Sequence, residues 1–127
     1  MHTRRRSPRL AGSAVTFATV RRVALQFPGV EEGASYGTPA FRVKGKFLAR
    51  LKEDGATLVV RIDQDEREAW MAADPETFFI TNHYRGWPAM LVRLASVDRG
   101  ELRKLLELAW RRSAPKRLIA ERDGARR

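Results

Sequence analysis

The most unusual chemistry in this sequence lies in one short stretch, His83–Pro88, which reads His-Tyr-Arg-Gly-Trp-Pro. It places two aromatic rings, an imidazole and a guanidinium beside a glycine and a proline, a composition typical of a surface connection. Aromatic rings stack on nucleic-acid bases, and an arginine binds phosphate or the edge of guanine. The stretch therefore predicts a nucleic-acid contact made by His83, Tyr84, Arg85 and Trp87. The alternative is a packed loop in which Tyr84 and Trp87 cover the edge of the core and Arg85 is solvated.

A second group of candidates is a set of cations between residues 42 and 52, with no acidic residue among them: Arg42, Lys44, Lys46, Arg50 and Lys52. All five occupy even positions, and successive side chains of a strand point to opposite faces. We therefore expect the odd positions to be buried and the cations to be exposed. The odd positions are Phe41, Val43, Gly45, Phe47, Ala49 and Leu51. The charged face is either a phosphate-binding surface or an ordinary solvated face. In the second case the lysines would keep the molecule soluble and prevent the edge of the sheet from pairing with other chains.

The sequence offers little for catalysis. It has no cysteine, and its two histidines, His2 and His83, are too few for a zinc site. Neither the phosphate-binding motif G-x-x-x-x-G-K-[ST] nor the dinucleotide motif G-x-G-x-x-G is present. Asp63, Asp65 and Glu66 could hold a metal, but Asp63 and Glu66 also have the spacing of a helix capping box, which we favour. We expect a protein that is not an enzyme and that needs neither metal nor cofactor.

Periodicity and turn residues predict the elements that position these candidates. Apolar residues at helical spacing predict a first helix over 16–26, which Pro28 and Gly29 end. Turns at Lys44–Lys46 and Asp54–Gly55 divide residues 39–62 into a three-stranded antiparallel meander. We expect a loop at 30–33, an irregular lead-in at 35–39, a helix at 63–74, strands at 78–81 and 89–94, and a helix that begins at a capping box of Asp98 and Glu101.

The resulting order is helix, three strands, helix, two strands, helix. This order predicts an α+β fold, with a mostly antiparallel sheet and helices packed on it in a single two-layer domain. We place the domain at residues 13–119. A disordered basic arm over 1–12 and a frayed C-terminal tail over 120–127 complete the prediction.

The charge of the chain is formally +10 over its 127 residues, but most of it lies outside the expected domain body. Residues 1–12 carry four arginines and no acid, and residues 114–127 carry five cations against two acids. The case for an anionic partner therefore rests on clustering rather than on net charge. The chain shows no apolar run of the roughly 20 residues that a membrane span needs, and no secretory signal. We expect a cytoplasmic protein with no membrane contact, since a cysteine-free chain suits a reducing compartment.

Four segments together resemble the MmcQ/YjbR family of small bacterial proteins. They are Leu25–Glu32, Tyr36–Phe41, His83–Pro88 with Leu91–Leu94, and Ala114–Leu118, in the order and spacing of that family. The resemblance covers about residues 14–120 and excludes the arginine-rich arm.

The resemblance implies a fold similar to type III secretion chaperones, with the same element order as above. It also implies DNA binding by two hairpin wings. Here these would be the turn Lys44–Lys46 and the segment His83–Trp87. Trp87 stands where the family often has tyrosine, so an aromatic ring is kept. The resemblance makes Lys116 and Arg117 part of a shared feature rather than of a tail.

Three functions follow, in order of preference. The first is binding of nucleic acid, double-stranded DNA foremost. Its contacts would be Arg42, Lys44, Lys46, Arg50, Lys52, His83, Tyr84, Arg85, Trp87, Lys116 and Arg117. The second is a protein-interaction domain, by analogy with the chaperone-like fold. The third is binding of a small anionic ligand between Tyr36, His83, Tyr84 and Arg85. The oligomeric state is left open, with a monomer slightly favoured.

Overall fold

Residues 15–125 are described in a computed structural model of the chain, and its centre is an antiparallel sheet of six strands in the order β1-β2-β3-β4-β6-β5. The elements along the chain are α1 (Phe17–Ala24), β1 (Val30–Ser35), β2 (Thr38–Val43), β3 (Lys46–Leu51), β4 (Thr57–Arg61), α2 (Gln64–Ala73), β5 (Phe78–Phe79), the 3-10 helix η1 (Asn82–Tyr84), β6 (Ala89–Arg93), α3 (Arg99–Ser113) and α4 (Lys116–Ala125). The α+β prediction is confirmed. The expected arm over 1–12 lies outside the described residues.

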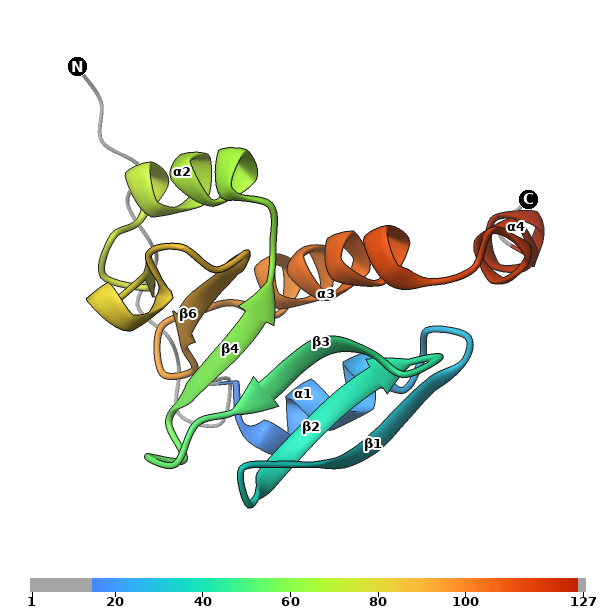
Figure 1. Cartoon of the computed structure of the whole chain (residues 1–127), viewed down its shortest axis with the longest axis horizontal. Helices are drawn as coiled ribbons and strands as arrows, with labels where there is room; N and C mark the ends of the chain where they lie inside the picture. The colour runs from blue at the N-terminus through green and yellow to red at the C-terminus, as the bar shows by residue number, and fades with distance from the viewer. Residues whose placement is uncertain (1–14, 126–127) are drawn as a thin grey trace.

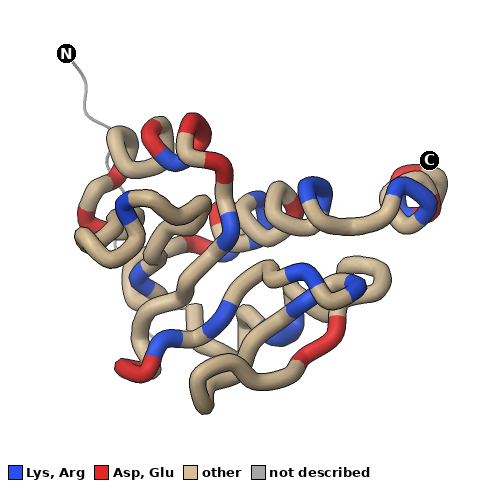
Figure 2. Tube along the Cα trace, viewed as in Figure 1, with Lys and Arg blue, Asp and Glu red and all other residues tan. Residues whose placement is uncertain are grey.

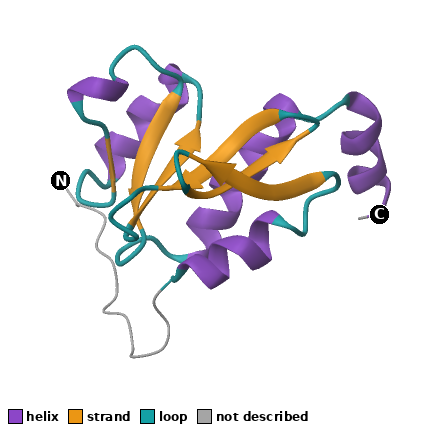
Figure 3. Ribbon diagram, turned by 60° about the horizontal axis from the view of Figure 1, so that its bottom comes forward, coloured by secondary structure: helices purple, strands orange, loops and turns teal. Residues whose placement is uncertain are grey.

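Helices α1, α2 and α3 pack on one face of the sheet, which makes the fold two-layered. Helices α1 and α3 contact each other and lie behind β2 and β3, while α2 packs against β5 and β6 (Figure 1). Figure 3 shows the twisted strands with helices grouped against them. The main core lies between the layers, where Trp110 of α3 is fully buried and donates its Nε1–H to the carbonyl of Pro28 at 2.9 Å.

The first difference from expectation is β1, because residues 30–33 were predicted to be a loop. They form an edge strand that pairs with β2 from Val30↔Val43 to Ser35↔Thr38. The connecting turn has positive φ at both Tyr36 (54°) and Gly37 (80°), the conformation of a tight type I′ hairpin. Every side chain of β1 is exposed or half-buried, so the strand carries no apolar alternation that would reveal it.

The second difference is a bulge in the β2–β3 hairpin. The predicted turn forms, with positive φ at Lys44 and Gly45, but Phe41 pairs with Ala49 and Arg42 with Phe47. One extra β3 residue is thereby inserted, and a bulge of this kind reverses the faces beyond it. As a result Leu48 is buried in the main core, whereas Phe47, predicted to lie there, packs on the opposite face.

Of the two capping boxes predicted at helix starts, one forms and one does not. The capping box of Asp98 and Glu101 forms at α3 as predicted, with the Glu101 N–H donating to Asp98 Oδ1 at 2.8 Å. The capping box predicted for Asp63 and Glu66 is wrong, because the Asp63 side chain makes no cap bond to α2 and instead forms an ion pair with Arg112.

The C-terminal end of the described chain is helical beyond the expected boundary. Helix α4 extends to Ala125, so residues 120–125, expected in a frayed tail, are ordered as a helix. It is attached to α3 by Arg111, which donates to Asp123 at 2.7 Å, and it buries Leu118. The carboxylates of Asp123, first, and of Glu107 raise the pKa of the Arg111 guanidinium, which keeps the guanidinium protonated.

Candidate nucleic-acid interface

The face of the sheet that α1, α2 and α3 leave open carries a small apolar cluster of its own. Val59, Ala89 and Leu91 are buried there, with Phe47, Phe79 and Tyr84 packed around them. Val59 lies between Leu58 and Val60, which belong to the main core, so strand alternation assigns the two sets to opposite faces. The same alternation places Arg50 and Arg61 on the open face, beside the cluster.

A groove of about 860 Å³ lies over this cluster, between the β1–β2 turn, β3, and the segment 82–88. We call it the basic groove. Its lining residues are Ser35, Tyr36, Lys46, Phe47, Arg50, Glu53, Val59, Arg61, His83, Tyr84, Trp87, Pro88, Ala89, Arg112 and Ser113. The lining thus contains four Lys or Arg side chains and a single carboxylate, Glu53. Figure 2 shows Lys and Arg along β2, β3 and β4, with acidic residues on α2, on the edge strand β1 and in the β3–β4 turn.

Two exposed aromatic side chains, from different segments of the chain, line the basic groove. Tyr36, in the β1–β2 turn, is 83% exposed, and Trp87, in the segment before β6, is 62% exposed. Exposing rings of this size to water is unfavourable, and such rings commonly mark a binding surface. His83 and Tyr84 add two further rings, which meet edge to face with centroids 5.0 Å apart. The groove can therefore offer stacking surfaces as well as charge.

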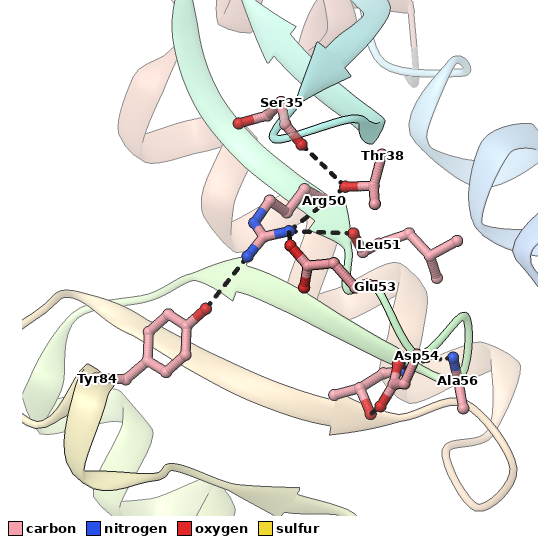
Figure 4. Close-up of polar contacts among 9 residues, drawn as sticks. Ser35, Thr38, Arg50, Leu51, Glu53, Asp54, Ala56 and Tyr84 are labelled. Atoms are coloured by element: carbon pink, nitrogen blue, oxygen red, sulfur yellow. Dashed lines mark hydrogen bonds and ion pairs between the residues drawn. The ribbon is translucent and has the colours of Figure 1, made fainter.

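Arg50 organises one end of the groove through contacts within the protein (Figure 4). Its guanidinium donates to the carbonyl of Leu51 at 3.3 Å and to the Tyr84 hydroxyl at 3.5 Å, and lies 3.4 Å from the Glu53 carboxylate. It also lies over the ring of Tyr36, 5.2 Å from the centroid. Much of its donor capacity is therefore already used.

The acidic residues near this end are held in their charged forms. A backbone hydrogen bond, followed by the charges of Arg50 and Lys52, lowers the pKa of Glu53 against the opposing effect of burial. The pKa of Asp54, in the β3–β4 turn, is lowered chiefly by the Ala56 N–H, which donates to its carboxylate at 2.9 Å. One rim of the groove therefore carries negative charge at neutral pH.

The other end of the groove is formed where β3 begins and β4 ends. Lys46, the first residue of β3, is exposed. Arg61, the last residue of β4, lies two residues beyond Val59, the partner of Arg50, in the direction of Lys46, and both cations line the groove. Nη1 of Arg61 is buried and has no hydrogen-bond partner in the described part of the chain. Arg112 joins them from the C-terminal turn of α3, paired with Asp63.

A buried arginine holds the segment 84–89 in place. Arg67 of α2 is only 4% exposed, and its guanidinium donates to the carbonyls of Trp87 at 2.8 Å, Ala89 at 2.9 Å, Arg85 at 3.2 Å and Tyr84 at 3.3 Å. A charged donor shared among several carbonyls fixes the path of a backbone that has few ladder bonds of its own. Arg67 therefore determines where Trp87 stands.

The structure brings together only part of the predicted interface. Five of the predicted contacts line the basic groove: Lys46, Arg50, His83, Tyr84 and Trp87. The other six do not line it: Arg42, Lys44, Lys52, Arg85, Lys116 and Arg117. Arg85 donates to the Asn82 side chain at 2.7 Å. Lys116 and Arg117 begin α4, whose Leu118 lies close to Gly29 and Val43, near the turn that holds Lys44.

Sequence reasoning missed Arg61, Arg67 and Arg112. Arg61 had a usable signal, because Leu58, Val60 and Ile62 alternate toward the core and assign Arg61 to the same face as Val59. Arg67 also had one, since it precedes Trp70 and Met71 by three and four residues and so shares their helical stripe. Arg112 had none, because its position depends on how α3 crosses the sheet.

The described residues hold neither a metal cluster nor a membrane-spanning helix. Within residues 15–125, no group of three or more His, Cys, Asp or Glu side chains is arranged to hold a metal ion. The helices in this part of the chain are too short or too polar to cross a membrane.

Comparison with known proteins agrees with the resemblance found in the sequence. A model of the YjbR family matches residues 25–112, which is more than half of the chain. The uncharacterized proteins Mb2600 of Mycobacterium bovis and Rv2570 of Mycobacterium tuberculosis are each 39% identical over 66 residues, 51% of this chain and 51% of the relative. The chain thus matches about half the length of these curated relatives. The matched range contains all six strands and the whole of the segment 82–88 that borders the groove, and on this basis the chain belongs to the YjbR family.

Proposed function

We propose that the protein binds DNA, with the basic groove as its central contact. The observation that carries this proposal is the composition of the groove, in which exposed aromatic rings stand beside four cations and a single carboxylate. Proteins that bind nucleic acid combine these two features, because phosphates attract the cations and the bases stack on the rings. Lys44 is exposed in the hairpin turn that precedes Lys46, so it adds a further cation close to the groove.

The protein-interaction alternative has less support. In the described residues the exposed large hydrophobic side chains are Leu25, Tyr36 and Trp87. Two of these three line the basic groove, so they do not form a broad apolar surface of the kind that a chaperone presents to its client. Their position among cations favours an anionic partner with flat rings.

The test is fluorescence anisotropy of the full chain with labelled DNA, both as a duplex and as a single strand. We expect affinity for the duplex to fall steeply with salt. A plot of the logarithm of the binding constant against the logarithm of salt concentration should have a slope of about −3.6 for four phosphate contacts. Lys46→Gln should weaken binding and reduce the slope by about one contact. The matched control is Lys104→Gln, an exposed lysine of α3 that does not line the groove.

A second control separates the groove from the arginine-rich N-terminus. Replacing Arg4, Arg5, Arg6 and Arg9 with glutamine in the full chain removes four positive charges while leaving the groove intact. The proposal requires that this variant still binds at low salt and that Lys46→Gln weakens it further. If the arm variant loses all binding, or if Lys46→Gln and Lys104→Gln behave alike, the groove is not the DNA-binding surface.

A further inference from the structure

We propose that the basic groove contains a subsite for one unpaired nucleoside phosphate, with the phosphate at Lys46 and Arg61 and the base against Trp87. This inference deepens the proposed function and rests on it where the nucleotide belongs to a DNA strand. A free nucleotide has the same chemistry, and the experiment below separates the two sources.

The two ends of the groove differ in how far their cations are already satisfied. At one end, Arg50 donates to Leu51 and Tyr84 and lies beside Glu53. At the other end, Nη1 of Arg61 is buried without a partner among the described residues. A buried donor without an acceptor is unfavourable, so Arg61 gains a hydrogen bond when a small movement of its side chain brings Nη1 from its covered position to an anion in the groove. The phosphate is therefore expected at the Arg61 end.

The acids near the Arg61 end do not oppose an anion there. Asp63 follows β4 closely, but its carboxylate is paired with Arg112 and does not line the groove. Glu53, the carboxylate that does line it, lies at the Arg50 end. Lys46 pairs with Val43 of the covered face, so its long side chain lines the groove from the end of the hairpin rather than from the open face. Together with Arg61 it supplies positive charge that is not neutralised within the groove lining, and phosphate is the anion that such a pair binds well.

Trp87 stands close to this end and is held in position. The backbone N–H of Ile62, next to Arg61, donates to the carbonyl of Pro88 at 2.9 Å, and Arg61 pairs with Ala89 across the sheet. Arg67 binds the carbonyl of Trp87 itself at 2.8 Å. The indole is therefore exposed but carried on a fixed backbone, which reduces the entropy lost when a base stacks on it.

The floor of the groove suits a flat ring rather than a second charge. Val59 and Ala89 are buried apolar residues, and Phe47 reaches this face because of the β-bulge. A base in a duplex has both faces stacked, so only an unpaired nucleotide can present a ring to Trp87. The volume of about 860 Å³ lies within the range of small-molecule sites.

The test uses the full chain and three probes: adenosine 5′-monophosphate, adenosine and inorganic phosphate. Isothermal titration calorimetry should show the monophosphate binding at least about tenfold more tightly than either part alone. Stacking should also quench the intrinsic tryptophan fluorescence, a measurement that needs no variant. A monophosphate that binds no better than inorganic phosphate, without quenching, would refute the subsite.

Variants then assign the two halves of the subsite. Arg61→Gln should weaken monophosphate binding about tenfold, and Arg61→Lys should restore part of it. Trp87→Ala should weaken it, whereas Trp87→Phe should keep binding but lose most of the quench. The matched control is Arg93→Gln, an exposed arginine of β6 on the same sheet face but outside the groove. Equal losses for Arg61→Gln and Arg93→Gln would show general charge attraction and overturn the assignment.

A 5′-phosphorylated single strand of DNA separates this inference from the proposed function. If the strand binds through Lys46 but is indifferent to Arg61→Gln and Trp87→Ala, and the monophosphate does not bind, the subsite is refuted while DNA binding stands. If the monophosphate binds with the expected dependences and neither strand nor duplex binds, DNA binding is refuted and the ligand is a free nucleotide.

Discussion

The two faces of the sheet are built from the same strands and differ in what covers them. On one face α1, α2 and α3 bury a continuous core that includes Phe41, Phe78 and Trp110. On the other, a small apolar cluster is ringed by arginines and left open as the basic groove. Because neighbouring residues of a strand belong to opposite faces, stability and binding can be altered almost independently at adjacent positions.

Strand β5 provides the sharpest comparison of the faces, because it places one phenylalanine on each. Phe78 is fully buried in the main core, and Phe79 is half-buried under Arg93, whose guanidinium lies 4.3 Å from its ring centroid. We expect Phe78→Ala to reduce the free energy of unfolding by about 3–5 kcal/mol. Phe79→Ala should cost only about 1–2 kcal/mol. Urea unfolding measures both, and equal losses would mean that the open face is a second structural core.

The next largest effect is expected at Arg67, which links the covered side to the groove. Arg67→Met removes a charged donor from four backbone carbonyls and should cost about 2–3 kcal/mol. It should also release Trp87 and weaken nucleotide binding, while hydrogen exchange of residues 84–89 becomes faster. Arg85→Met is the control, since its exposed side chain bonds only locally to Asn82. The linking role is excluded if exchange in this segment stays slow in Arg67→Met.

Two aspartates at helix starts separate stability from binding at a smaller scale. Asp98→Ala removes a formed cap bond on the covered side and should lower the free energy of unfolding by about 1 kcal/mol without changing DNA affinity.

Asp63→Ala removes no cap bond but frees Arg112 at the groove, so DNA affinity at low salt should rise about two- to fivefold. If Asp63→Ala instead lowered the free energy of unfolding and left DNA affinity unchanged, Asp63 would be acting as a helix cap.

The smallest expected effect is on the pH dependence of the free energy of unfolding. It arises from Asp54 in the β3–β4 turn, which belongs to neither face of the sheet. Hydrogen bonds from the backbone of Ala56 and from Thr57 lower the pKa of Asp54 below its ordinary value of 3.8. A carboxyl whose folded pKa is depressed stabilises the fold above its unfolded pKa and loses that contribution as the pH falls. Unfolding free energies measured below pH 3.8 should therefore depend less on pH in Asp54→Asn than in the native chain. Identical slopes would show that these bonds persist equally in the unfolded state.

Local patterns predicted much of the fold. Helical spacing gave α1 and α3, the Lys44–Gly45 turn gave the central hairpin, and Asp98 with Glu101 marked the start of α3. These features depend on contacts between near neighbours in the chain. The strand β1 escaped because an exposed edge strand needs only backbone pairing with β2, which leaves no mark in side-chain periodicity.

The candidate site was predictable only in part. Composition and residue order show which side chains are available: an aromatic segment at 83–87, a run of cations in the hairpin, and few catalytic groups. Which of these side chains lie together depends on long-range packing. A bulge turned Phe47 to the open face, antiparallel pairing brought Lys46 to the end that holds Arg61, and the crossing of α3 added Arg112. Strand register and helix crossing are set by long-range packing, so the groove is a property of the assembled sheet rather than of any one segment.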